Sequence, residues 1–115
     1  MNKLHSLILA ITLLVGSVSV ATAQDSFKGT EAYSAGDYQT ALQELRPLAE
    51  QGDTFAQWML GWMYKHGEGV SQDYAEAAKW YRLSAEQGDT DAQLKLGLMY
   101  KHGEGVPQDY AEAAK

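Results

Sequence analysis

The sequence predicts an all-α protein, an α/α solenoid built from helix–turn–helix repeats. Residues 49–79 recur 36 positions later at 85–115, with 26 of the 31 positions identical. Within each copy the apolar residues recur at helical spacing, and no stretch after residue 23 alternates apolar and polar residues as a half-buried strand does. A repeat of this length is typical of solenoids, in which each unit buries its apolar face only against its neighbours.

Residues 1–23 have the layout of a secretory signal peptide. Lys3 and His5 precede an apolar run at 7–15, and small residues follow up to Ala21-Thr22-Ala23, a suitable cleavage site. The alternative is an uncleaved membrane anchor, which needs about 20 predominantly apolar residues. Glycine and hydroxyl residues dilute the segment after the run. We therefore expect export to the periplasm or the extracellular space, with no stable membrane anchor after cleavage.

The composition of the remaining 92 residues limits the partners. Eight basic and 15 acidic residues give a net charge of −7, and there is no cysteine. Such a surface repels phosphate backbones and anionic membranes, so nucleic acid is not an expected partner. Without disulfides, stability has to come from packing between the repeats. The length suits one small domain.

The first unit is a divergent hairpin at 24–48. Its predicted first helix covers about 26–34 and runs into a short turn at Gly36. Pro47 lies inside its second helix and should kink it by removing one backbone hydrogen bond.

The second unit, 49–84, shows the full pattern. Its first helix begins near Asp53, and Thr54-x-x-Gln57 has the form of a capping box, as does Thr90-x-x-Gln93 in the next unit. Gly67 should end this helix, a Gly-rich loop follows at 65–72, and a second helix should run from an Asp73 N-cap to Gly88.

The third unit, 85–115, repeats this order as far as Lys115, the counterpart of Lys79, with Asp109 as the second N-cap. The counterparts of Trp80, Tyr81 and Leu83 do not occur in it. A helix of 110–115 is marginal alone because nucleation is costly. We therefore expect a fragment of a longer repeat array or a truncated gene product.

The repeated pattern A-x-x-x-L-G-x-x-Y-x-x-G-x-G-V-x-x-D-Y-x-x-A-x-x-W-Y closely resembles the Sel-one-like repeat, a relative of the tetratricopeptide repeat. It stands here as Ala56, Leu60, Gly61, Tyr64, Gly67, Gly69, Val70, Asp73, Tyr74, Ala77, Trp80 and Tyr81. The resemblance covers about residues 25–115. It implies a right-handed superhelix that acts as a scaffold or adaptor for other proteins, and not an enzyme.

The differences between the two copies indicate a binding face. Four of the five fall at i, i+3, i+4 and i+7, which is one stripe of a helix; the pairs are Phe55/Asp91, Trp58/Leu94, Met59/Lys95, Trp62/Leu98 and, in the loop, Ser71/Pro107. In the related tetratricopeptide fold, residues of the first helices line the inner groove. This resemblance predicts a partner-binding groove of Phe55, Trp58, Trp62 and Lys65 with Asp91, Leu94, Leu98 and Lys101, and places Met59 and Lys95 beside it.

Two interpretations of this groove stay open. Trp58 and Trp62, one turn apart, could anchor an extended peptide or a partner helix, since such side chains dominate binding energy. Alternatively, they pack against the preceding divergent unit as ordinary interface core, or do both.

Other chemistry finds little support. His66 and Glu68, and His102 and Glu104, fall short of a metal ligand set and are interpreted as parts of solvated turns. Neither S-x-x-K nor G-x-S-x-G occurs. We predict no catalytic residue, no cofactor and no metal.

The predicted function is an exported scaffold or adaptor that binds another protein or peptide through the concave face. The alternative is a cell-wall hydrolase, or its accessory domain, acting on peptidoglycan or β-lactams, with a cell-wall component as partner. Some exported relatives are described as penicillin-interacting hydrolases, but these are rich in cysteine and this chain has none.

Overall fold

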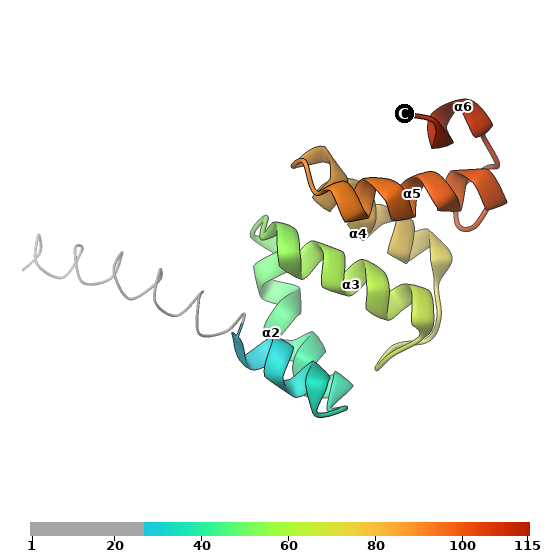
Figure 1. Ribbon diagram of the computed structural model, residues 1–115. Coiled ribbons are helices and arrows are strands. Elements are labelled where there is room, and N and C mark those ends of the chain that lie inside the picture. The colour runs from blue at the N-terminus through green and yellow to red at the C-terminus, as the bar shows by residue number, and fades with distance from the viewer. Residues whose placement is uncertain (1–26) are drawn as a thin grey trace, which may run out of the picture.

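A computed structural model describes residues 27–115, and this part of the chain is all helical (Figure 1). A helical segment at 27–34 is followed by α2 (Tyr38–Glu50), α3 (Thr54–His66), α4 (Tyr74–Glu86), α5 (Thr90–His102) and α6 (Tyr110–Ala113). No strand occurs in these residues, and the predicted all-α class is confirmed. The predicted signal peptide lies outside the described residues.

Each helix packs mainly on the helix before it and the helix after it. The close pairs are α2 with α3, α3 with α4, α4 with α5, and α5 with α6. Figure 1 shows the resulting stack, in which α3 and α5 lie beside one another and the loops after them lie at the same side. This is the α/α solenoid that the 36-residue period predicts.

Aspartates begin the helices, and the predicted capping boxes do not form. Asp53 and Asp89 accept hydrogen bonds from the backbone N–H groups three residues later, at 2.8 Å each. Gln57 Nε2 instead donates to the carbonyl of Ala49 at 3.1 Å. Because Asp53 already caps α3, the Gln57 side chain can hydrogen-bond to α2 instead of to its own helix end. The predicted N-caps Asp73 and Asp109 are confirmed, each accepting a backbone N–H at 3.1 Å.

Glycine ends α3 as predicted. Gly67 has a φ of 66°, in the left-handed region, and its N–H donates to the carbonyl of Met63. In the first unit, the helical segment at 27–34 is followed by α2, which continues through Pro47 to Glu50; the kink stays a prediction.

The core lies between successive units. One cluster joins α2, α3 and α4 and includes Leu45, Leu60 and Trp80; a second joins α4 and α5 around Tyr81 and Met99. The ring of Tyr81 lies directly on Gly61, where an added β-carbon would stand 2.8 Å from the ring atoms. Glycine at this position therefore allows α4 to approach α3 closely.

Candidate functional site: an aromatic ladder on α3

The altered stripe of α3 forms a continuous aromatic stack. Phe55 and Trp58 have ring centroids 6.3 Å apart, Trp58 and Trp62 5.9 Å, and Trp62 and His66 4.0 Å, all with stacked orientation. The residues share one helix face because they are spaced at three or four positions. We call Phe55, Trp58, Trp62 and His66 the aromatic ladder.

The substituted residues of α5 contact this ladder directly. Trp58 Nε1 donates to Asp91 Oδ2 at 2.6 Å, and the ammonium of Lys95 lies 5.0 Å from the ring centroid of Trp62. Lys95 and Asp91 also form an ion pair at 3.7 Å. The differences between the two copies are therefore complementary. Asp91 and Lys95, the charged residues at the altered positions of the third unit, contact the tryptophan rings at the altered positions of the second unit.

On its other side the ladder is fixed to the first hairpin. Trp62 Nε1 donates to the hydroxyl of Tyr33 at 2.9 Å, and that hydroxyl donates to the carboxylate of Glu68 at 3.0 Å. Burial and the hydrogen bond to Glu68 raise the pKa of Tyr33. Tyr33 was missed by sequence reasoning because it lies in the divergent helix, outside the repeated pattern.

The interpretation of His66 and Glu68 as parts of a solvated turn holds only in part, because His66 is exposed but both side chains have partners. α3 extends to His66, four residues after Trp62, so its ring stacks on the indole and its Nδ1 lies 2.9 Å from the Trp62 carbonyl. Glu68 accepts from Tyr33 of the preceding hairpin. The spacing of His66 from Trp62 was the signal available in the sequence.

Met59 is also placed differently from the prediction. Its side chain is 5% exposed and belongs to the core with Leu45 and Leu60, not to the border of a groove. The step of one residue from Trp58 rotates it about 100° around the helix toward α2. Lys95, at the same position of the next unit, reaches the ladder with its long side chain.

The remaining predicted groove residues differ in exposure. Phe55, Leu94 and Leu98 are 44%, 61% and 40% exposed, and we call them the exposed trio. Lys65 is half-buried and Lys101 exposed. Trp58 and Trp62 are half-buried and pack against the core clusters. The tryptophans thus form part of the interface between units, and the more exposed apolar side chains of the predicted groove lie on Phe55 and α5.

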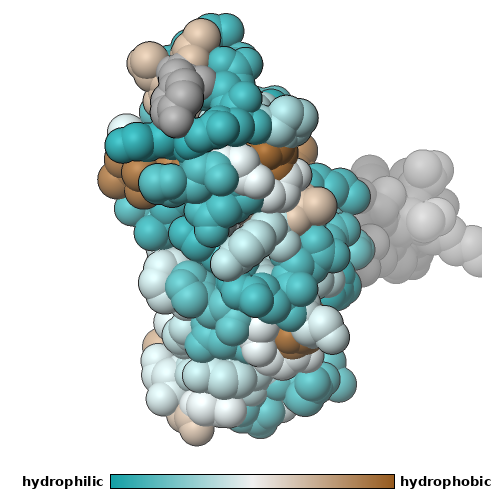
Figure 2. Space-filling model, turned by 90° about the vertical axis from the view of Figure 1, so that its right-hand side faces the viewer, coloured by the Kyte–Doolittle hydropathy of each residue, from teal (hydrophilic) through white to brown (hydrophobic). Residues whose placement is uncertain are grey.

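The rest of the surface offers few other sites. The side that carries the loops is mostly hydrophilic, with small separate hydrophobic spots (Figure 2). Across residues 27–115, no group of three His, Cys, Asp or Glu side chains is placed to hold a metal ion, and no helix has the length and apolar character of a membrane span.

Comparison with known proteins gives consistent matches. The sequence profile of the Sel1 repeat matches residues 54–89 and 90–115. A solved Sel1 repeat protein from Oxalobacter formigenes is similar over 77% of this chain and 36% of its own, with a TM-score of 0.71 and 36% identity. A protective antigen with an SLR fold, present in uropathogenic Escherichia coli strains, is similar over 89% of this chain and 23% of its own, with a TM-score of 0.76 and 38% identity.

One similar protein has a regulatory name. It is an exopolysaccharide production negative regulator of Rhizobium leguminosarum bv. viciae, 44% identical over 50 residues. The match covers 43% of this chain and 19% of the regulator. The chain thus spans well under half the length of each of these relatives.

Proposed function

The chain belongs to the Sel1 repeat family, and we propose that it is an exported scaffold that binds another protein or peptide through the wall formed by α3 and α5. We take this wall as the concave side of the superhelix, as the resemblance to the tetratricopeptide fold implies. The observation that carries the proposal is the exposed trio, three large apolar side chains of which one lies in the ladder and two on the next unit's first helix. Phe55 stacks on Trp58, and Leu94 and Leu98 lie on the same helix as the Asp91 and Lys95 side chains that contact the ladder. Exposed apolar side chains on such a wall are those that an interaction site would use.

The contacts of the ladder indicate what such a partner would meet. Both indole N–H groups already donate within the protein, to Asp91 and Tyr33. The ladder therefore offers a fixed apolar shape rather than free donors, which suits apolar side chains of an extended peptide or a helix. Fixing the rings beforehand also reduces the entropy lost on binding.

The test is site-specific photocrosslinking in cells that express the gene. A photoreactive residue at Leu94 or Leu98 should crosslink to a discrete partner, whereas the same residue at Leu83 should not. Leu83 is a matched control because it is 37% exposed but lies on the second helix, α4. Equal crosslinking from both helices would contradict binding through the α3–α5 wall.

Charge substitutions supply a second measurement. Leu98→Asp should abolish capture of the crosslinked partner with little change in Tm, because Leu98 is 40% exposed and lies outside the buried core, and Leu83→Asp should keep the capture. Loss of capture by both variants would contradict a specific wall.

Export is tested by the mass of the protein recovered from the periplasm or the medium. The proposal expects a mature chain that starts at Gln24. An intact Met1 on a cytoplasmic or membrane-bound product would contradict export.

The hydrolase hypothesis stays a prediction, and turnover of muropeptides or a β-lactam would test it. Within residues 27–115, the repeated aspartates Asp53, Asp73 and Asp89 cap helices, so they do not converge as an acid–base pair would.

A further inference from the structure

Two tyrosines of the first unit lie against one another and against a single carboxylate. The ring centroids of Tyr33, in the segment 27–34, and Tyr38, at the start of α2, are 5.3 Å apart, and the ring planes are tilted by 47°. The Tyr33 hydroxyl donates to the Glu68 carboxylate, 3.0 Å from Oε1 and 3.1 Å from Oε2. Hydrogen bonding to the same carboxylate raises the pKa of Tyr38. The two phenols therefore share one group that can accept a proton.

The packing around this pair holds the two rings in place. Both side chains are half-buried and pack against the core cluster that includes α2 and α3. Gly69, the residue after Glu68, lies so close to α2 that an added β-carbon would stand 2.8 Å from the β-carbon of Tyr38. Trp62 Nε1 donates to the Tyr33 hydroxyl as well. The rings and the carboxylate are thus positioned before any reaction occurs.

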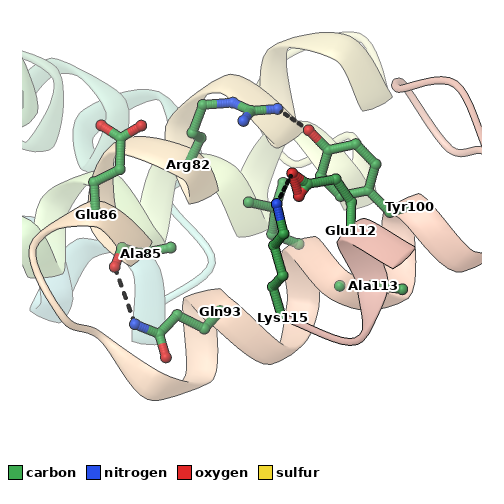
Figure 3. Close-up of a pocket in the computed structure, with 10 residues that line it drawn as sticks. Arg82, Ala85, Glu86, Gln93, Tyr100, Glu112, Ala113 and Lys115 are labelled. Carbon is green, nitrogen blue, oxygen red and sulfur yellow. Dashed lines mark hydrogen bonds and ion pairs between the residues drawn. The ribbon is translucent and has the colours of Figure 1, made fainter. Parts of the chain in front are cut away.

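No other tyrosine side chain that the structure describes has these surroundings. None of the others is in ring contact with a second tyrosine; they are Tyr64, Tyr74, Tyr81 and Tyr100. Tyr64 and Tyr100 instead accept hydrogen bonds from arginines, and Figure 3 shows the bond from Arg82 to Tyr100. A guanidinium has donors only, so it cannot accept a phenolic proton.

The pair occurs once along the sequence. Tyr74 is the counterpart of Tyr38 in the second unit, but the residues 36 and 72 positions after Tyr33 are Gly69 and Gly105. The tyrosine pair is therefore a property of the first unit and not of the repeated scaffold.

We propose that Tyr33 and Tyr38 are a site of oxidative cross-linking, at which a one-electron oxidant, such as the oxidised haem of a peroxidase, joins the two rings by a carbon–carbon bond. Each phenol gives one electron to the oxidant, while its hydroxyl proton passes to the Glu68 carboxylate and from there to water. The two phenoxyl radicals couple at ring carbons next to those that carry the oxygens. The hydrogen on each coupled carbon then moves to the oxygen and restores the hydroxyl. In total, two oxidant equivalents take up two electrons, two protons are released and one bond forms.

The hydrogen bond to Glu68 favours this route. Burial and this bond raise the pKa of Tyr33, so its hydroxyl stays protonated near neutral pH. An electron leaves a protonated phenol readily only when the proton leaves with it. The carboxylate, 3.0 Å away, is positioned to accept that proton.

The cross-link would fix the first hairpin. It would join the segment 27–34 to α2 across the turn at Gly36, in a chain that has no cysteine for a disulfide. A covalent link of this kind restricts the unfolded chain and thereby stabilises the folded one. Because the Tyr33 hydroxyl also accepts from Trp62, the link would hold the residue that anchors the aromatic ladder.

The experiment exposes the full chain, at low concentration, to a photogenerated ruthenium(III) complex that accepts one electron per molecule. The expected product is a monomer that has lost two hydrogen atoms, shows the blue fluorescence of a biphenol and gives a peptide map linking residue 33 to residue 38. Its Tm should be higher than that of the untreated chain. A map that links other tyrosines, or oxidation of Trp58 and Trp62 without any biphenol, would overturn the proposal.

Three variants assign the roles of the side chains. Tyr33→Phe should abolish the cross-link, whereas Tyr74→Phe should leave its yield unchanged. Tyr74 is a matched control because it is the counterpart of Tyr38 and is more exposed. Glu68→Gln keeps an oxygen that accepts a hydrogen bond but removes the base, so it should slow the cross-linking at least about tenfold, with a circular dichroism spectrum like the parent's.

A biphenol that persists in Tyr33→Phe, or is lost in Tyr74→Phe, would show that accessibility and not the pair directs the oxidation. An unchanged rate in Glu68→Gln would refute the transfer of the proton to this carboxylate.

Discussion

The dipeptide Leu-Gly occurs at the same place in both copies, at 60–61 and 96–97, with different surroundings, and this gives a matched pair of substitutions. Replacing glycine by alanine inside a helix stabilises it by about 0.5–1 kcal/mol through backbone entropy. At Gly61 the new β-carbon would lie 2.8 Å from ring atoms of the fully buried Tyr81. Overpacking of this kind costs about 1–3 kcal/mol. The net expectation for Gly61→Ala is a loss of about 1–2 kcal/mol.

At Gly97 the added β-carbon causes little steric conflict. The nearest atom to the new β-carbon is the carbonyl oxygen of Ala113, at 3.0 Å, in a short terminal helix that can shift. The gain in helix propensity should therefore dominate, and Gly97→Ala should be neutral or slightly stabilising.

Thermal unfolding followed by circular dichroism separates the two cases. For a domain of this size a change of 1 kcal/mol shifts Tm by about 4–8 °C, so Gly61→Ala should lower Tm by roughly 5–15 °C and Gly97→Ala should leave it unchanged or raise it by a few degrees. The matched position cancels effects of helix propensity. Equal shifts in the two variants would refute the assignment of Gly61 as the contact surface of Tyr81.

Three further predictions follow from the contacts of the units. Asp91→Ala removes the acceptor of Trp58 Nε1 and should lower the free energy of unfolding by about 1 kcal/mol, measured in urea; a stability equal to the parent's would contradict a formed bond. Tyr33→Phe removes the link between Trp62 and the first hairpin and should cost about 1 kcal/mol, with a change in the near-ultraviolet signal of the ladder, while an unaltered spectrum would contradict the link. Burial raises the pKa of Tyr81 above its ordinary value of 10.0, so the folded state holds the phenolic proton more tightly than the unfolded state, and the free energy of unfolding should fall as the pH rises past about 10. Tyr81→Phe, which removes a buried hydroxyl without a partner, should be as stable as the parent near neutral pH and should lack Tyr81's share of this decline. A pH profile identical to the parent's would contradict this expectation.

The sequence predicts the helices of the scaffold well because the signals that define them are local. Period, caps and stop signals act within a few residues, so Asp53, Asp73 and Gly67 could be assigned to helix ends before the structure was known. The contacts of the candidate binding face were harder to predict, because they join different units. The bond from Trp58 to Asp91 spans 33 positions and depends on how α3 and α5 are stacked.

Other errors have the same origin. Glu68 was assigned to solvent because its neighbours in sequence are glycines, whereas its partner, Tyr33, is 35 positions away. Met59 shared a stripe with Phe55 and Trp62, but a helical stripe is wide enough for one edge to face the core. Periodicity thus predicts which face of a helix is apolar, whereas packing against neighbouring helices decides which residues at the edges of that face are buried.

The bonds of Asp91 and Lys95 with the ladder give the two copies a fixed order along the rod. Inserting another unit of the 54–89 type between them would place a phenylalanine and a methionine against Trp58 and Trp62, and the indole would lose its carboxylate. The invariant residues would still stack, so the rod would grow longer while its inner wall became more apolar. Changes in copy number, the simplest mutation available to a duplicated gene, would therefore alter the wall that we propose as the binding surface while leaving the architecture intact.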